Sequence, residues 1–162
     1  MKFELLNPKK HNRKKFDCGV DVLNIYLQQF ANQDQNKDLS RIHVLADKER
    51  IIGYYSISSH SVSSHELPDN QRFSKYLYTP FLLLGRLAVD NDFQKQGYGD
   101  ALIFHAFKIT TAAAENIGIS GMVVDAKDET AANFYAKFGF KRLLTASNRL
   151  VLPLSAIKPL LD

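Results

Sequence analysis

The residues with the clearest chemical potential lie at positions 94–99, where the sequence reads Gln-Lys-Gln-Gly-Tyr-Gly. Gly97 and Gly99 fall between an apolar run at residues 81–89 and a stretch with helical periodicity. In the first turn of a helix the backbone N–H groups lack partners and the helix dipole is positive, so an anion is held there without a cationic side chain. Glycine lets the backbone approach that anion closely. The pattern predicts an anion-binding turn, and the alternative is a turn that contains two glycines by chance.

Two other glycine-rich motifs do not fit these residues. A dinucleotide-binding fingerprint would need a third glycine at position 102, which is Leu102. A P-loop would need Gly-Lys followed by Ser or Thr, and this triplet does not follow Gly97 or Gly99. The anion is therefore expected to be bound in another way.

A strand and a helix must position this turn. The nearly continuous apolar run at residues 81–89 predicts a strand that is buried on both faces. The helical pattern that follows has one apolar side, formed by Leu102, Ile103, Ala106, Ile109 and Ala113. A second apolar strand is expected at residues 119–126, about 30 residues after the first, and this spacing predicts a right-handed crossover between parallel strands.

The rest of the chain alternates between the two kinds of periodicity. Before the central strand we expect a short strand at residues 1–6, an amphipathic helix from Val20 to Ala31, a polar loop at 32–38, a hairpin of residues 40–46 and 51–58, and a long loop at 59–80 with a short helix at 70–77. After the second strand we expect a helix that opens at Asp128 and ends at Gly139, strands at 140–144 and 149–154, and an apolar tail at 157–161.

Length and composition bound the class of protein. The 162 residues predict a single domain, residues 1–162, with 45% hydrophobic and 23% charged residues, which is ordinary for a globular protein. No apolar run approaches the length of a membrane span, and residues 1–15 are too polar for a signal peptide, so we expect a cytoplasmic protein without a membrane partner. Cys18 is the single cysteine, which excludes an internal disulfide and offers no metal cluster, and an inert packed thiol is expected there.

The positive charge is local. The net charge is +4, but residues 1–15 alone carry a balance of +5, so the remaining residues sum to −1. A basic segment of this kind can follow phosphate groups, or it can be a solvated segment with no partner, and both readings stay open. Its basic residues are Lys2, Lys9, Lys10, Arg13, Lys14 and Lys15.

Four blocks of the sequence resemble the GNAT N-acetyltransferases, in the TacT-like branch of toxins that acetylate aminoacyl-tRNA in type II toxin-antitoxin systems. The blocks are Phe16-Asp17-Cys18-Gly19 with Leu23, Tyr26 and Leu27; Leu83-Leu84-Gly85-Arg86-Leu87-Ala88-Val89-Asp90; Gln94-Lys95-Gln96-Gly97-Tyr98-Gly99; and Val124-Asp125-Ala126-Lys127-Asp128 through Phe134-Tyr135-Ala136-Lys137-Phe138-Gly139-Phe140. The resemblance extends over residues 5–150. It implies an α+β fold, in which a central mixed α/β sheet opens in a V-shaped split between two parallel strands and is flanked by helices.

The resemblance also implies the site residues. Acetyl-CoA would enter the split, with its pantetheine arm against the backbone of Leu87, Ala88 and Val89. Tyr135 would be the general acid that protonates the departing CoA thiolate; the alternative from the sequence alone is a core tyrosine on an apolar helix face. Many family members have Asn at the position of Asp128, so Asn133 is the expected source of an amide contact. The residues expected around the diphosphate are Gln94, Lys95, Gln96, Gly97, Tyr98, Gly99 and Asp100.

The chemistry of amines indicates which class of acceptor the enzyme would use. The sequence offers no obvious general base; a lysine substrate with a pKa near 10.4 would need one, whereas an α-amine is already partly neutral at pH 7. This favours an aminoacyl acceptor, and the resemblance implies that the acceptor is charged tRNA and that its acetylation inhibits translation. The candidate phosphate-binding residues are Lys14, Lys15, Arg41 and Arg86, with Lys9, Lys10, Arg13, Arg72 and Lys75 as further candidates. Arg86 interrupts an apolar run, so it faces either a cleft or a buried ion pair.

Two other functions remain open. The first is a GNAT enzyme that acetylates a small amine or a protein N-terminus, and the second is a non-catalytic module that binds CoA or RNA. The resemblance further implies a homodimer and a ribbon-helix-helix antitoxin as partners, with no metal. The apolar tail at residues 157–161 would serve the dimer contact or cap the core.

Overall fold

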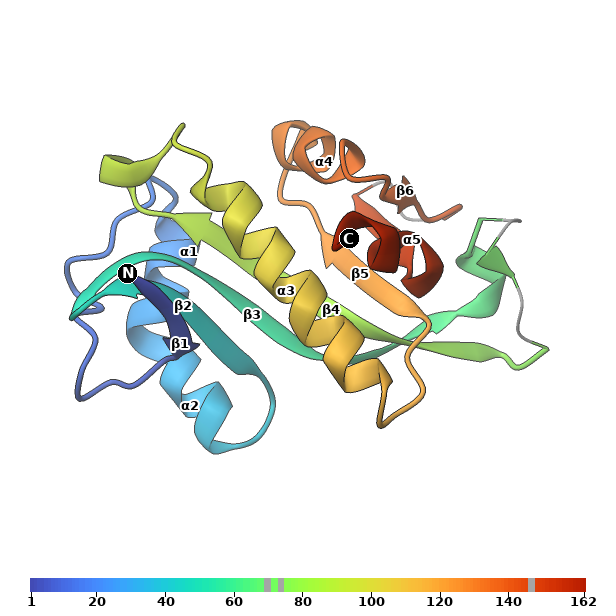
Figure 1. Cartoon of the computed structure of the whole chain (residues 1–162), viewed down its shortest axis with the longest axis horizontal. Helices are drawn as coiled ribbons and strands as arrows, with labels where there is room; N and C mark the ends of the chain where they lie inside the picture. Colours follow the sequence, from blue (N-terminus) through green and yellow to red (C-terminus); the bar gives the residue numbers. More distant parts are fainter. Residues whose placement is uncertain (69–70, 73–74, 146–147) are drawn as a thin grey trace. The chain divides into compact units, whose positions relative to one another are not determined.

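The computed structural model describes residues 1–68, 71–72, 75–145 and 148–162 (Figure 1). Its strands and helices alternate as the apolar periodicities predict. In chain order they are β1 (Lys2–Leu5), α1 (Asp21–Ile25), the π-helix η1 (Tyr26–Phe30), α2 (Ala31–Asn36), β2 (Arg41–Asp47), β3 (Arg50–Ser63), the 3₁₀ turn η2 (Ser64–Glu66), β4 (Tyr78–Val89), the 3₁₀ turn η4 (Asn91–Phe93), α3 (Tyr98–Ala114), β5 (Gly121–Asp125), α4 (Glu129–Ala136), β6 (Lys141–Arg142), β7 (Arg149–Pro153) and α5 (Leu154–Leu160).

The chain forms two compact units. Unit 1 comprises Met1–Ser58 and Gly85–Ala106, and unit 2 comprises Ser59–Leu84 and Phe107–Asp162. The strands are hydrogen-bonded in the order β1-β2-β3-β4-β5-β7-β6, with both parallel and antiparallel pairs, so the expected mixed sheet is confirmed.

In unit 1, strands β1, β2 and β3 are antiparallel and one face is covered by the N-terminal helices. The side chains of Ile42, Val44 and Tyr54 form one hydrophobic cluster with Leu27 and Ala31. Because successive strand residues point to opposite faces, the next residues along β2 and β3 lie against α3 instead. Figure 1 shows α1 and α2 behind these strands and α3 in front of them.

The polar loop expected at residues 32–38 is wrong as far as residue 36, because the helix continues through α2. Its polar side chains have tertiary partners: the Gln35 Nε2 donates to the Leu6 carbonyl (3.1 Å) and the Ile42 N–H donates to the Gln35 Oε1 (3.1 Å). Asp34 accepts a hydrogen bond from the Tyr26 hydroxyl (2.7 Å). A polar stretch that finds such partners remains helical, although its composition resembles that of a loop.

In unit 2, the expected parallel pairing is confirmed. Leu82, Leu83 and Leu84 of β4 pair with residues 122–124 of β5, and α3 belongs to the crossover that joins these strands. β5 and β6 pair with β7 in the antiparallel sense, as expected for the last two strands. The hydrophobic core of this unit contains Val62, Leu67, Phe81, Val123, Leu143 and Val151.

The long loop expected at residues 59–80 is shorter in the structure. β3 continues to Ser63 and β4 begins at Tyr78, and the Ser64 N–H donates to the Leu77 carbonyl (2.9 Å). Serine-rich composition suggested a loop, but the alternation of exposed serines with buried Val62 is that of a strand. The short helix expected at residues 70–77 falls partly outside the described residues.

The apolar tail is helical and contributes to the core of unit 2. α5 begins directly after β7, and Ile157 is fully buried (0% exposed). Of the two roles considered for this segment, capping the core is the one that the burial of Ile157 supports. Among the described residues, no helix combines the length and apolar character needed to cross a bilayer.

Candidate functional site

The turn between β4 and α3 presents unpaired backbone donors. Lys95 and Gly97 adopt the left-handed conformation, with φ of 61° and 86°, and α3 begins at Tyr98. The first helical hydrogen bond here runs from the Ala101 N–H to the Gly97 carbonyl (3.1 Å). Within the described part of the chain, no group accepts a hydrogen bond from the N–H of Gly97, Tyr98 or Gly99. The turn can therefore offer these donors to an anion.

Gly97 has a conformational reason to be glycine. A Cβ atom added to it would meet no heavy atom within 4 Å, so the space beside it is open, but its positive φ strains any residue with a side chain.

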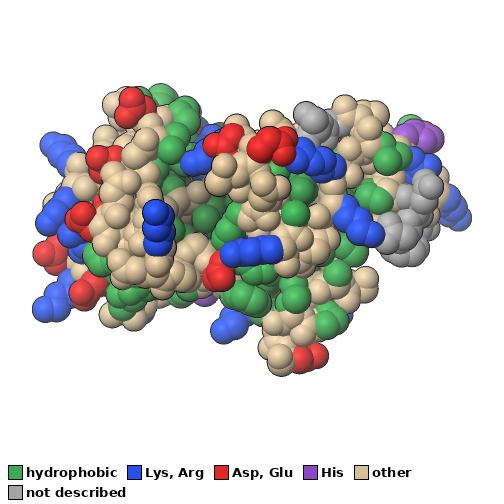
Figure 2. All heavy atoms as spheres, turned by 90° about the horizontal axis from the view of Figure 1, so that it is seen from above, with side chains coloured by type: hydrophobic (Ala, Val, Ile, Leu, Met, Phe, Trp, Pro, Cys, Tyr) green, Lys and Arg blue, Asp and Glu red, His purple; other side chains and the backbone are tan. Residues whose placement is uncertain are grey.

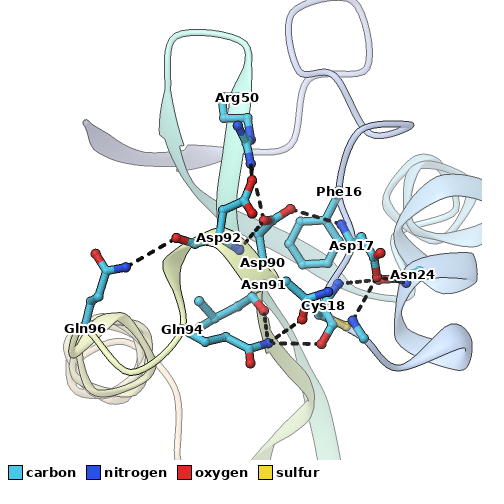
Figure 3. Close-up of polar contacts among 12 residues, drawn as sticks. Phe16, Asp17, Cys18, Asn24, Arg50, Asp90, Asn91, Asp92, Gln94 and Gln96 are labelled. Carbon is cyan, nitrogen blue, oxygen red and sulfur yellow. Dashed lines mark hydrogen bonds and ion pairs between the residues drawn. The ribbon is translucent and has the colours of Figure 1, made fainter.

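The glutamines of this segment brace the turn (Figure 3). The Gln94 Nε2 donates to the carbonyls of Val89 (2.9 Å) and Cys18 (3.0 Å) and to the Asn91 Oδ1 (3.2 Å). The Gln96 Nε2 donates to the Asp92 carbonyl (3.3 Å). The sequence analysis predicted that both residues surround the diphosphate; in the structure their side-chain amides hold protein carbonyl groups, so their support for an anion would be indirect.

Asp90 lies beneath the same turn and was not among the predicted site residues. Its carboxylate is 3% exposed and accepts hydrogen bonds from the backbone N–H groups of Asp17 (3.0 Å) and Asp92 (3.0 Å). Arg50, at the start of β3, pairs with Asp90 (3.3 Å) and Asp92 (2.8 Å), and its guanidinium lies 5.0 Å from the Phe93 ring centre. In this position Arg50 bridges both carboxylates (Figure 3).

The segment of residues 16–19 packs on the turn from the other side. The Asn91 N–H donates to the Asp17 carbonyl (2.8 Å), while the Asp17 Oδ1 accepts hydrogen bonds from the Gly19 N–H and the Asn24 side chain (2.9 Å each). A Cβ atom on Gly19 would lie 3.1 Å from the Asn91 Oδ1, and its φ is +85°, so this close approach requires glycine. The Phe-Asp-Cys-Gly block of the sequence was the signal that could have identified this contact.

The C-terminal part of β4 extends beyond its pairing with β5. The register with β5 ends at Leu84 and Val124, whereas β4 continues to Val89. Ala88 is buried, and Leu87 and Val89 are half-buried. This is the arrangement expected for the pantetheine-binding residues, whose role stays a prediction.

Tyr135 lies on α4 with a buried ring and an unpartnered hydroxyl. Its ring is 6% exposed and packs edge-on against Phe134 (5.2 Å) and Phe140 (5.7 Å). Among the described residues none hydrogen bonds to the hydroxyl, whose oxygen is not one of the buried polar atoms without a partner, so it reaches solvent. Burial, and then the charge of Asp125, raises the pKa of Tyr135, so this hydroxyl is a proton donor throughout the physiological pH range.

The helix that carries Tyr135 begins with a side-chain cap. The Asp128 Oδ1 accepts a hydrogen bond from the Ala131 N–H (2.8 Å), so this side chain is engaged in capping the helix. Asn133 is exposed on the same helix, so its amide is accessible.

A second polar cluster in unit 2 was also missed by the sequence analysis. Arg149 forms a two-point ion pair with Asp125 (2.6 and 3.0 Å), and its Nη1 lies 3.0 Å from the His60 Nε2. Burial, and then the Arg149 charge, lowers the pKa of His60, so the ring is neutral at pH 7 and its Nε2 accepts from Arg149. That nitrogen is therefore not available as a general base.

The predicted phosphate-binding cations differ in their surroundings. Lys14 and Lys15 are exposed. The Arg86 guanidinium lies 3.5 Å from the Tyr26 ring centre, which is a cation–π contact in place of a buried ion pair. Arg41 pairs with Asp38 (2.7 Å) and donates to the Gln35 carbonyl (3.2 Å), so it caps the end of α2.

The basic N-terminal segment is partly neutralised. Lys10 pairs with Glu4 (2.9 Å), which also contacts buried His11 (2.8 Å), and these contacts lower the pKa of Glu4 to about 2. At the left end of Figure 2, basic and acidic side chains alternate. For the residues that the structure describes, no group of three His, Cys, Asp or Glu side chains is placed to hold a metal ion.

Comparisons with known proteins identify the architecture. Residues 38–142 match the family described as acetyltransferase (GNAT) domain. The chain is 28% identical over 171 residues to the probable toxin TacT of Sinorhizobium fredii, with 98% of this chain and 93% of that protein covered. It is 32% identical over 126 residues to a tRNA-acetylating toxin of Mycobacterium tuberculosis, with 78% and 76% covered.

Solved structures of toxins have the same fold. A tyrosine-to-phenylalanine mutant of KacT aligns with a TM-score of 0.92 at 31% identity over 98% of each chain. AtaT complexed with acetyl-methionyl-tRNAfMet aligns with a TM-score of 0.91 at 29% identity over 99% of each chain. A tyrosine-to-phenylalanine mutant of the AtaT toxin, bound to the C-terminus of the antitoxin AtaR and acetyl-CoA, aligns with a TM-score of 0.84 at 28% identity over 98% of this chain and 96% of that chain.

Proposed function

The chain belongs to the GNAT acetyltransferase family, and on this premise we propose that it transfers the acetyl group of acetyl-CoA to the α-amine of an aminoacyl-tRNA and so inhibits translation. The observation that carries the proposal is that no described residue accepts a hydrogen bond from the N–H groups of Gly97, Tyr98 and Gly99, in a turn whose shape is held by side chains. A diphosphate is the anion that suits several convergent backbone donors at a helix N-terminus.

Acetyl-CoA would be bound by three groups of residues. The amides of residues 97–99, beside Lys95 and Asp100, would hold the diphosphate, with Gln94 and Gln96 supporting the turn from behind. The backbone of Leu87, Ala88 and Val89 would pair with the pantetheine arm in the manner of an added strand. Exposed Asn133 would supply an amide contact.

The proposed reaction needs one proton donor from this chain, which is Tyr135. Acetyl transfer forms a bond between the acceptor nitrogen and the acetyl carbon and breaks the bond from that carbon to sulfur. The amine attacks in its neutral form, and the proton that its nitrogen loses after the attack passes to water. Tyr135 donates its hydroxyl proton to the departing thiolate and regains a proton from water. The raised pKa of Tyr135 keeps this proton in place at neutral pH.

No general base is assigned among the described residues, and this supports an acceptor amine that is already partly neutral at pH 7. The α-amine of an aminoacyl ester is partly neutral at pH 7, because α-amines have pKa values near 8 and the ester withdraws electrons. A lysine amine would require a base, and the Nε2 of His60 is engaged by Arg149. One similar protein is named a tRNA-acetylating toxin and another was solved in complex with acetyl-methionyl-tRNAfMet, which supports the same acceptor class here.

The test is a direct comparison of acceptors. The protein is incubated with labelled acetyl-CoA and, in parallel, with total charged tRNA, the same tRNA after deacylation, and a panel of polyamines and peptides. We expect label in charged tRNA alone. Label in a polyamine or peptide while charged tRNA stays unlabelled would reject the proposed acceptor, and no transfer to any acceptor despite CoA binding would indicate a non-catalytic module.

The partners complete the proposal. A structure of AtaT with the C-terminus of the antitoxin AtaR supports an antitoxin for this chain, and we propose one of the ribbon-helix-helix class, acting on a cytoplasmic homodimer. Lys14, Lys15, Arg86 and Arg41 would contact tRNA phosphates. Expression in bacteria should arrest growth, and co-expression of the adjacent gene should restore it; growth arrest that persists with every neighbouring gene contradicts the antitoxin.

A further inference from the structure

The network around Asp90 connects two segments that are far apart in sequence. Resting on the proposed function, we infer that Asp90 and Arg50 are positioning residues: they set the affinity for the diphosphate of CoA by holding the turn of residues 91–97 in its binding shape, without contacting the diphosphate.

Asp90 is buried, and a buried carboxylate needs partners that stabilise its charge. A carboxylate that is 3% exposed is unfavourable unless it is paired and hydrogen-bonded. Its Oδ2 accepts from the Asp17 N–H, and its Oδ1 accepts from the Asp92 N–H and pairs with Arg50. The charge is thus directed into the protein, toward the two segments that it joins.

The bonds of Asp90 belong to a larger set between the same two segments. The Asn91 N–H binds the Asp17 carbonyl, and the Gln94 side chain binds the Cys18 carbonyl. The path of the chain into α3 is therefore set by residues 17–19. This explains how, among the described residues, the N–H groups of Gly97, Tyr98 and Gly99 stay free of protein partners while the preceding backbone is held in place (Figure 3).

The positive charge of Arg50 neutralises the carboxylates of Asp90 and Asp92. Asp90 lies beneath the turn that is proposed to receive a diphosphate and Asp92 lies within it, and two uncompensated carboxylates would repel the diphosphate. Arg50 is within 3.3 Å of one and 2.8 Å of the other, and its ring contact with Phe93 fixes the guanidinium plane. A guanidinium shared by two carboxylates serves to neutralise and fix them, which differs from the role of a free phosphate ligand.

The test measures CoA binding by calorimetry in the absence of any acceptor. Asp90→Asn keeps the size of the side chain but places an NH₂ group against a backbone N–H donor, and we expect CoA to bind at least tenfold more weakly. The matched control is Asp38→Asn, which removes the charge of an exposed ion pair with Arg41 at a left-handed residue that asparagine also tolerates. We expect the control to bind CoA within twofold of the wild type.

A donor without a diphosphate separates positioning from catalysis. With S-acetylpantetheine, kcat/KM of Asp90→Asn should stay within threefold of the wild type, while kcat/KM for acetyl-CoA falls at least tenfold. Equal losses with both donors, or unchanged CoA affinity in Asp90→Asn, overturn the inference. If the wild type itself does not bind CoA, the proposed function fails first, which distinguishes the two failures.

Arg50→Lys provides a second variant should Asp90→Asn not fold. Lysine keeps the positive charge but cannot bridge both carboxylates in a fixed plane, so we expect CoA affinity to fall at least fivefold. If Arg50→Lys retains the affinity while Arg50→Gln loses it, the charge itself binds the phosphate and the positioning role is wrong. Thermal unfolding of each variant checks that the fold is intact.

Discussion

Replacing Tyr135 by phenylalanine removes a single oxygen atom, and the structure separates its effect on catalysis from its effect on stability. The ring packs against Phe134 and Phe140, and these contacts are retained in the variant. Because no described residue hydrogen bonds to the hydroxyl, the variant loses no intramolecular hydrogen bond. We expect the free energy of unfolding to change by less than about 0.5 kcal/mol.

The catalytic effect of Tyr135→Phe should be large. A positioned general acid contributes about 10²–10⁴ to the rate, which corresponds to roughly 3–5 kcal/mol of the activation barrier. We expect kcat to fall at least about 100-fold and the Kd for CoA to stay within about twofold. The assay is single-turnover transfer from labelled acetyl-CoA to charged tRNA, together with calorimetric binding and urea denaturation of the same preparations.

The matched control is Tyr54→Phe in the core of unit 1. The Tyr54 hydroxyl donates to the Leu23 carbonyl (2.7 Å), so this variant should lose about 1 kcal/mol of stability and keep its kcat. Tyr135→Phe should therefore lose kcat and keep its stability, whereas Tyr54→Phe should lose stability and keep its kcat. The reasoning is refuted if Tyr135→Phe keeps more than a third of the wild-type kcat, or if it loses stability as Tyr54→Phe does. The raised pKa of Tyr135 further predicts no alkaline loss of kcat from this group below about pH 10.

Three further predictions concern the turn and the histidines. Gln94→Glu replaces a donor by an acceptor facing two carbonyls and an amide oxygen, so it should lose about 1–3 kcal/mol of turn stability and raise the KM for acetyl-CoA at least tenfold by steady-state kinetics, with an unchanged KM as the contrary result. Gly97→Ala should weaken CoA binding by about 1–2 kcal/mol by calorimetry because of its positive φ, whereas Gly118→Ala, equally open but without that constraint, should bind like the wild type. Burial, and then His105, lowers the pKa of His43 from 6.5 to about 4, so the folded state resists protonation and its stability falls as the pH drops from about 6.5 toward 4. Allowing for partial exposure, urea denaturation should show about 1–2 kcal/mol less stability from this residue at pH 5 than at pH 7.5, and the loss should shrink in His43→Phe.

Polar composition led to wrong loop predictions for two segments that tertiary contacts hold in regular secondary structure. Gln35 and Asp34 were assigned to a loop, but they form hydrogen bonds to Leu6, to β2 and to η1, and the helix extends through them. The serines at positions 59–63, at the end of β3, were assigned to a loop as well, although they alternate with a buried valine. In both cases the polar residues are visible in the local sequence, whereas the contacts that hold the segment in a helix or a strand come from elsewhere in the chain.

The roles of individual polar side chains depended in the same way on distant partners. Gln94 was expected to face the anion, but its amide is drawn to carbonyl groups at residues 18 and 89. Arg41 was expected to bind phosphate, which stays a prediction, and in this structure its guanidinium contacts Asp38 and the Gln35 carbonyl at the end of α2. A motif identifies which residues belong to a site, because their types and spacing are local, but it does not state which way each side chain points.

The sequence by itself determined most of the strands and helices along the chain, the parallel crossover and the position of the glycine turn at the start of α3, because each depends on periodicity or on residue types within a short window. Tyr135 became a candidate through the family resemblance of residues 134–140. Only the tertiary structure decided that residues 16–19 clamp the turn, that Arg50 joins Asp90 to Asp92, and that the Tyr135 hydroxyl is left without a partner. These facts depend on which of many possible long-range contacts satisfies each buried polar group, and that choice is made when the whole chain packs.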